Sequence, residues 1–337
     1  MIRRPRPLAL SNWLFLVTAM VFLMVVIGGI TRLTESGLSM TRWEPVSGIV
    51  PPLNNVQWQT EFDSYKATPE YQQINRDMSL AAFKSIYFWE YLHRALGRLI
   101  GLAVAVPLTW FALTRAIPRG YGPRLAALLA LGGLQGFIGW WMVKSGLVDR
   151  TDVSHFRLAT HLGTALFIMS FSLWTALSLR DLARPRLPGG DRPRGWIAPY
   201  FLLLATQIIW GAFVAGLNAG YAFNTWPKMG DDWIAPHVRD TFAGPLWGLI
   251  NDAITVQFVH RWLAVAVALF ALHIAGKLWR HRVGLPALAM GMMVLIQFGL
   301  GVATLLNGVP IWLGVAHQAG GALLIVASVW AAHRVTR

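Results

Sequence analysis

The chain has 337 residues, of which 55% are hydrophobic and only 13% are charged, and it contains 17 tryptophans. This composition is too apolar for a soluble globular domain and indicates an integral membrane protein. The formal net charge of +14 does not indicate nucleic-acid binding, because the Lys and Arg residues stand mainly in short links between apolar runs, where they orient a chain in the lipid bilayer. The absence of cysteine excludes disulfides, thiolate nucleophiles and cysteine-ligated metals.

Eight apolar runs are long enough to cross the hydrocarbon layer, which takes roughly 20 residues of helix. They fall at about 12–31, 86–111, 122–144, 154–179, 196–217, 252–279, 284–306 and 312–333. Links that are basic and almost free of acid alternate with links that carry most of the Asp and Glu residues. By the positive-inside rule the basic links face the cytoplasm, so both termini are expected inside and the links 32–85 and 218–251 outside.

The second half of the chain repeats the first. The stretch GGITRLTESGLSMTRW (28–43) aligns with GAFVAGLNAGYAFNTW (211–226), and EYLHR, LQGFIG and HLGTA recur in the same order as QFVHR, IQFGLG and HQAGG. Spans one to four therefore correspond to spans five to eight. Because four is an even number, the halves have the same orientation, which predicts an all-α membrane protein of two four-helix bundles related by a pseudo-twofold axis along the membrane normal. The two halves are expected at 1–185 and 186–337.

Four of the nine histidines occupy equivalent places in this repeat. They are His93, His161, His260 and His317, each within about two turns of the outer end of an even-numbered span, and so at one depth. A single intramembrane histidine can merely bond two helices together, but four at equivalent places favour a function. Neutral imidazoles suit iron, copper or zinc. Without cysteines, and with one nearby carboxylate, the economical arrangement is two histidine pairs, each spanning a flat cofactor such as heme.

The other histidines do not add a second layer of pairs. His273 follows His260 by 13 residues and His333 follows His317 by 16, so at about 100° per residue each points away from the outer histidine of its span. The sequence therefore favours two hemes side by side near the outer surface. His155 is expected at the loop edge above the fourth span, with a supporting role left open.

The two sites differ at one position. Glu90 lies three residues before His93, on the same helix face, whereas Gln257 takes the equivalent place before His260. A carboxyl at the rim of an apolar bundle suits a general base or a proton relay, and the less favoured alternative is a structural partner of Arg94 or Arg98. The asymmetry predicts chemistry in the first half and electron handling in the second.

An arginine follows the histidine in both copies of the His-Arg pair. Arg94 and Arg261 are therefore candidates for binding heme propionates at the outer rim through charge-assisted hydrogen bonds. Positive residues that flank a span are also common without any such function.

Several longer motifs stand along the chain in a fixed order: GGITRLTESGLS, WEPVSGIVPP, TPEY, FKSIYFWEYLHR, RLATHL, VQFVHR and VPIWLGVAHQ. Together they cover nearly the whole chain and resemble the heme A synthase family. The resemblance implies an oxidoreductase of the bacterial inner membrane that serves cytochrome oxidase assembly. Such an enzyme oxidises a ring methyl of heme O to a formyl group by successive hydroxylations, with water as the oxygen source.

The resemblance also implies roles for single residues. His260 and His317 would bind a permanent heme b, His93 and His161 would flank the substrate heme, and Glu90 would be the functional acid. Expected partners are heme O, the lipid bilayer, a heme O synthase and an electron acceptor, and the oligomeric state is left open, a homo-oligomer included. Some members carry a cysteine pair in the first outer loop, and this chain has none.

Two other kinds of membrane protein would also contain such paired histidines. One is a bis-histidine membrane cytochrome of the b type that transfers electrons, and the other is a heme transporter or chaperone. A carrier would contain heme b alone, whereas a synthase would also contain heme O or heme A. A transporter would need no counterpart of Glu90 and would show no redox turnover.

Overall fold

The computed structural model describes residues 5–44, 47–148, 150–184, 193–245 and 247–336. Its regular elements are all helices. Eight of those in the described ranges are long and apolar enough to cross a membrane. They are α1 (Pro7–Leu33), α4 (Leu80–Leu113), α5 (Gly122–Lys144), α6 (His155–Ala183), α7 (Ile197–Gly216), α10 (Ala253–Arg280), α11 (Leu285–Leu306) and α12 (Ile311–Val335). The eight predicted spans are thus confirmed, and the chain is a multi-pass membrane protein.

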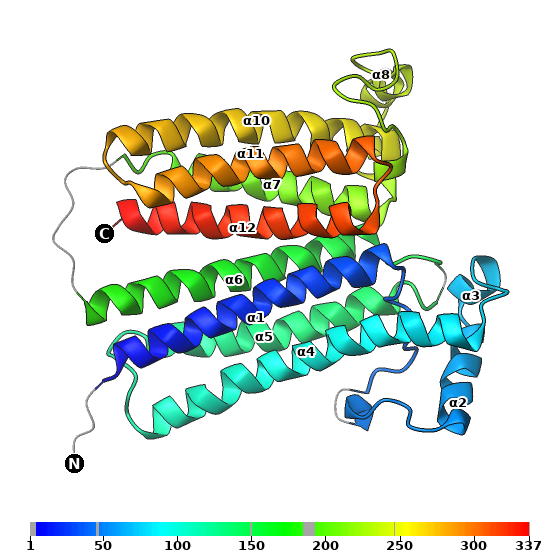
Figure 1. Ribbon diagram of the computed structural model, residues 1–337, viewed down its shortest axis with the longest axis horizontal. Coiled ribbons are helices and arrows are strands. Elements are labelled where there is room, and N and C mark those ends of the chain that lie inside the picture. Colours follow the sequence, from blue (N-terminus) through cyan, green and yellow to red (C-terminus); the bar gives the residue numbers. More distant parts are fainter. Residues whose placement is uncertain (1–4, 45–46, 149, 185–192, 246, 337) are drawn as a thin grey trace.

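Shorter helices occupy the long links. They are η1 (Ser47–Ile49), α2 (Asn55–Lys66), α3 (Pro69–Gln73), η2 (Ala219–Tyr221), α8 (Pro236–Ala243) and α9 (Gly248–Asn251). Local signals set several helix starts: the Ser79 side chain accepts the Ala82 N–H at the beginning of α4, and Asp252 accepts the Thr255 N–H at the beginning of α10. The cap at Ser79 lets α4 begin about two turns before its apolar run, so this helix extends beyond the other spanning helices at the end opposite the termini (Figure 1).

The spanning helices form two neighbouring groups (Figure 1). One contains α1, α4, α5 and α6, and the other contains α7, α10, α11 and α12. The groups meet where α1 packs on α12 and where α6 packs on α7 and α12. The grouping follows the chain order of the predicted halves, while their pseudo-twofold relation stays a prediction.

Polar side chains join the two groups across this junction. Gln318 on α12 donates to the carbonyl of Val25 on α1 at 2.6 Å, and Arg32 on α1 donates to the carbonyl of Ala215 on α7 at 2.7 Å. Since helices in a bilayer gain little from apolar burial, such bonds and close packing hold the bundle together.

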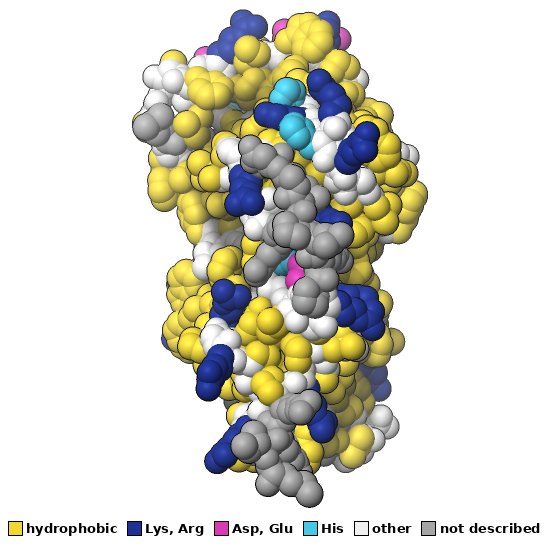
Figure 2. Space-filling model, turned by 90° about the vertical axis from the view of Figure 1, so that its left-hand side faces the viewer, with side chains coloured by type: hydrophobic (Ala, Val, Ile, Leu, Met, Phe, Trp, Pro, Cys, Tyr) yellow, Lys and Arg dark blue, Asp and Glu magenta, His cyan; other side chains and the backbone are white. Residues whose placement is uncertain are grey.

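Both termini lie at the same end of the bundle as the links α4–α5, α6–α7 and α10–α11 (Figure 1). Figure 2 views this end and shows Lys and Arg side chains spread over it, with little acidic surface. The helices α2, α3 and α8 lie at the opposite end. That the basic end faces the cytoplasm stays a prediction of the positive-inside rule.

The link between α1 and α4 folds into an outer cap over the first group. Its core is aromatic, because Phe62 and Tyr65 of α2 pack against Phe83 and Tyr87 at the outer end of α4. Glu70 of α3 is buried beside this cluster and accepts a hydrogen bond from the Tyr65 hydroxyl at 3.1 Å. The link is therefore a packed layer and not an ordinary surface loop.

The buried Glu70 makes the outer cap sensitive to pH. Burial raises the pKa of Glu70 to about 8 from the ordinary 4.5. Between these values the folded cap keeps a proton that the unfolded segment has released, so the stability of the cap falls as pH rises through this window. We expect amide hydrogen exchange in α2 and α3 to accelerate between pH 5 and pH 8, after correction for the intrinsic pH dependence of exchange. Glu70→Gln should remove this acceleration, and equal pH dependence in both proteins would contradict the assignment.

Candidate functional site

The four repeat-related histidines form two facing pairs. His93 on α4 and His161 on α6 have ring centres 6.5 Å apart, and those of His260 on α10 and His317 on α12 are 6.4 Å apart. In the first group, α4 and α6 each pack on α1 and α5, so the histidines face each other across the bundle. The structure therefore brings together the histidines that the repeat paired.

The spacing of each pair fits two axial ligands of one heme iron. Metal–imidazole bonds of about 2 Å and a ring radius of roughly 1.2 Å on each side would place two axial ring centres about 6.4 Å apart. The observed separations of 6.5 and 6.4 Å are close to that value. Both sites thus have the donor set and the spacing that bis-histidine heme ligation requires.

A glycine on a neighbouring helix backs each of the four rings. The pairs are Gly28 with His93, Gly139 with His161, Gly211 with His260 and Gly301 with His317. A Cβ at these glycines would lie between 2.9 and 3.1 Å from the imidazole Cε1, closer than an ordinary carbon contact of about 3.5–4.0 Å. The missing side chain leaves the space that the ring occupies. Sequence analysis aligned these glycines in the repeat but did not assign them this role.

Glutamines reach the second ring nitrogen of one histidine in each pair. The Nε2 of Gln135 lies 3.1 Å from the Nδ1 of His161, and that of Gln297 lies 3.2 Å from the Nδ1 of His317. The Nδ1 atoms of His93 and His260 are buried and have no hydrogen-bond partner in the described structure. The two glutamines occupy the same place in LQGFIG and IQFGLG, which was the signal available in the sequence.

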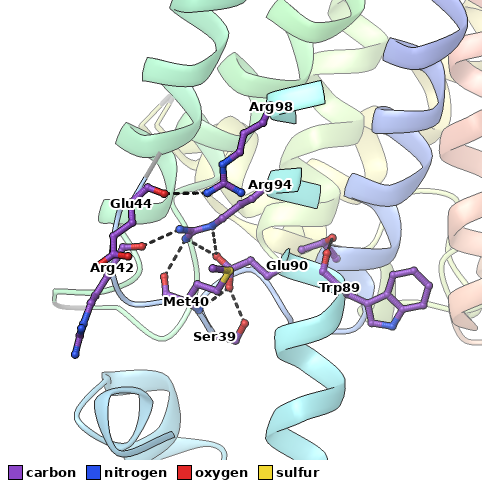
Figure 3. Close-up of polar contacts among 9 residues, drawn as sticks. Ser39, Met40, Arg42, Glu44, Trp89, Glu90, Arg94 and Arg98 are labelled. Atoms are coloured by element: carbon purple, nitrogen blue, oxygen red, sulfur yellow. Dashed lines mark hydrogen bonds and ion pairs between the residues drawn. The ribbon is translucent and has the colours of Figure 1, made fainter. Parts of the chain in front are cut away.

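Glu90 is buried, and both of its carboxylate oxygens have hydrogen-bond partners (Figure 3). One carboxylate oxygen accepts hydrogen bonds from the Ser39 hydroxyl and the Met40 N–H, both at 2.7 Å. The other pairs with the Arg94 guanidinium at 2.6 Å. Arg94 in turn donates to the carbonyls of Met40 and Arg42, at 2.9 and 2.8 Å. Glu90 and Arg94 thus fasten the first outer link to α4.

The second group repeats this fastening without a carboxylate. Gln257 donates to the carbonyl of Phe223 at 2.9 Å and accepts from Arg261 at 3.2 Å. Arg261 also donates to the carbonyl of Thr225 at 2.7 Å. In both copies of the His-Arg pair the arginine therefore ties an outer link to its helix. Only the first copy adds a carboxyl group to this network.

The remaining histidines lie apart from the two pairs. His155 begins α6, is buried, and donates from Nε2 to the carbonyl of Ile250 at 3.0 Å, which bridges the two groups. His155 therefore lies where the loop meets the start of α6 and is buried against the link that contains α9. His333 is buried at the inner end, 3.1 Å from the Ser178 hydroxyl, and His273 is exposed.

Comparisons with known proteins agree with this site. The family profile of cytochrome oxidase assembly proteins matches residues 11–329. The heme A synthase of Rhizorhabdus wittichii is 54% identical over 98% of this chain and 94% of its own length. Heme A synthases of Sphingopyxis alaskensis and Rhodospirillum centenum are 50% and 51% identical, over 99% and 97% of this chain and 94% and 88% of their own lengths. The chain therefore belongs to the heme A synthase family of cytochrome oxidase assembly proteins, which confirms the resemblance seen in the sequence.

Proposed function

We propose that this protein is a heme A synthase, which oxidises a ring methyl of heme O to a formyl group. The observation that carries the proposal is the coincidence of full-length similarity to heme A synthases with two histidine pairs at the spacing of axial heme ligands. With water as the oxygen source, the conversion of methyl to formyl releases four protons and four electrons. The reaction therefore needs proton acceptors in the chain and an electron acceptor beyond it.

We assign the substrate to His93 and His161 and a resident heme b to His260 and His317. The difference between the groups supports this assignment, because Glu90 is ionisable and Gln257 in the equivalent place is not. The first group alone has the aromatic cap of α2 and α3 above it. When bound, heme b supplies a redox centre next to the substrate site.

Arg94 and Arg261 are proposed to bind the propionates at the outer rim. Both guanidinium groups are held in place by carbonyls of the outer links. The Nε of Arg261 is buried without an acceptor, so it is available to an anionic group. A cavity of about 420 Å³ beside Arg94 is also lined by Arg42. The lining also includes Glu44 and Glu61, so the proposal rests on the fixed guanidinium groups and not on the net charge of the cavity.

The orientation in the bacterial membrane follows from the same arrangement. With the basic end in the cytoplasm, both termini lie inside and the outer cap lies outside. His161, His260 and His317 stand about two turns from the start of helices that begin at the end opposite the termini, which supports heme sites near the outer face. Heme O would come from a heme O synthase in the same membrane.

Expression in cells that make heme O but no heme A tests the proposed function. Chromatography of total hemes should show heme A, and the purified protein should contain heme b together with heme O or heme A. A folded protein that carries heme but leaves heme O unchanged would contradict the proposal. Heme b alone at both sites would instead identify an electron-transfer cytochrome.

Glu90 is the proposed acceptor of a proton released during oxidation. Glu90→Gln keeps the shape of the side chain but removes its basicity, so we expect heme A formation to fall by about 100-fold, within the range for general base catalysis. The measurement is heme A formed per folded protein. Ser39→Ala is the matched control, since it removes a hydrogen bond to the carboxylate and keeps the carboxylate itself. Equal losses in both variants would show that Glu90 acts only by fastening the outer link.

A further inference from the structure

The Gln297 side chain directs a hydrogen-bond donor at His317, where a histidine that binds iron would need an acceptor. An imidazole that binds a metal through Nε2 keeps its proton on Nδ1, and this N–H is usually given to an acceptor. In the structure the Gln297 amide nitrogen, which is a donor, lies 3.2 Å from the Nδ1 of His317. Iron ligation by His317 therefore requires an acceptor where a donor now stands.

Gln297 itself carries that acceptor. Its Oε1 is buried and has no hydrogen-bond partner among the described residues. The amide oxygen and nitrogen have nearly the same size, so a half-turn of the amide exchanges them without new space. After the turn, Oε1 faces the Nδ1–H of His317, and one bond satisfies two buried groups.

The corresponding residue of the first group is less free to turn. The Nε2 of Gln135 donates to the backbone carbonyl of His161 at 3.0 Å as well as facing the ring of that residue. A half-turn would cost Gln135 this bond and set its oxygen against the carbonyl oxygen. No second hydrogen bond of this kind holds the Gln297 amide within the described part of the chain. The two repeat-related glutamines are therefore not equivalent.

We propose that Gln297 is a positioning residue that accepts the Nδ1–H of His317 when heme b is bound. The bond fixes the tautomer and the plane of the ring and raises the electron-donating power of the ligand. It therefore stabilises ferric iron and lowers the reduction potential of the resident heme. The inference rests on the proposed assignment of heme b to His260 and His317.

The test measures the midpoint potential and the heme content of protein purified from cells that make heme b but no heme O. Gln297→Leu removes the acceptor and should raise the potential by a shift equivalent to about a tenfold change in the redox equilibrium, or roughly 59 mV for one electron. Gln297→Glu keeps the shape and can only accept, so it should retain heme and lower the potential. Gln135→Leu is the matched control and should leave the potential of the resident heme unchanged.

The outcomes separate this inference from the proposed function. Potentials of Gln297→Leu and Gln297→Glu that both equal the wild-type value would overturn the role of Gln297 and leave the enzyme assignment standing. If Gln297→Leu loses heme, the midpoint potential of Gln297→Glu is the test. A value below that of the wild type supports the role of Gln297, and an equal value overturns it. A wild-type protein that carries no heme b under these conditions would overturn the cofactor assignment itself.

Discussion

Replacing His317 by alanine is expected to yield a folded protein without a resident heme. The substitution removes one of two side chains whose ring centres are 6.4 Å apart and leaves His260 without an opposite ligand. Changes outside the ligand shell already cost roughly 10–100-fold in metal affinity, so loss of a ligand should lower heme content, and with it heme A formation, by more than about 100-fold. The absorbance spectrum of purified protein and heme chromatography measure both quantities.

His93→Ala is the matched variant in the first group. It should abolish heme A formation while the b-type spectrum of the second site remains. This difference follows from the proposed roles, because His93 faces His161 and not the second pair. If His93→Ala removes the resident heme and His317→Ala spares it, the assignment of substrate and cofactor is reversed.

The second large effect is expected at Gly301, which backs the His317 ring. An added Cβ would lie 2.9 Å from the Cε1 of His317, so the ring must shift by half an ångström or more to restore an ordinary contact of about 3.5–4.0 Å. Gly301→Ala should therefore tilt the ligand, lower heme content by about tenfold and cost about 1–3 kcal/mol of stability, as overpacking does. Heme content and thermal unfolding in detergent measure the two effects.

Gly299→Ala provides the control on the same helix. An added Cβ there has no heavy atom within 4 Å, and the residue is exposed on the bundle surface. Alanine is also the better helix former, by roughly 1 kcal/mol. Gly299→Ala should therefore keep the wild-type heme content. Equal heme loss in both variants would mean that α11 tolerates no side chain at all, and that the contact of Gly301 with His317 is not the cause.

Hydrophobic periodicity and length were sufficient to predict the spans. The expected starts of α10, α11 and α12 differ from the observed ones by one residue, since lipid contact requires an unbroken apolar run. Two helices begin earlier than expected: α1 starts at Pro7 instead of about residue 12, and the cap at Ser79 extends α4 through the amphipathic stretch before Phe88. A local hydrogen bond sets the start of α4, and a hydropathy profile does not detect such a bond.

The role of Glu90 shows where sequence reasoning was incomplete. The sequence alone showed that Glu90 and His93 share a helix face, and it suggested an ion pair between Glu90 and Arg94. The bonds from Ser39 and Met40 were not, because these residues lie about fifty positions away and meet Glu90 only after the outer link has folded. Nothing in the local pattern of a loop fixes which of its groups turns toward a buried carboxylate.

The sequence by itself determined the eight spans, the internal repeat and the identity of the four histidines, because each depends on composition or on spacing along the chain. Tertiary structure alone decided which groups surround those histidines. Gly211 and Gly301 lie behind their rings, and Gln297 lies at Nδ1, only because helices far apart in the chain pack side by side. The physical reason is that contact across helices depends on rotation and depth, which the period of a single helix does not specify.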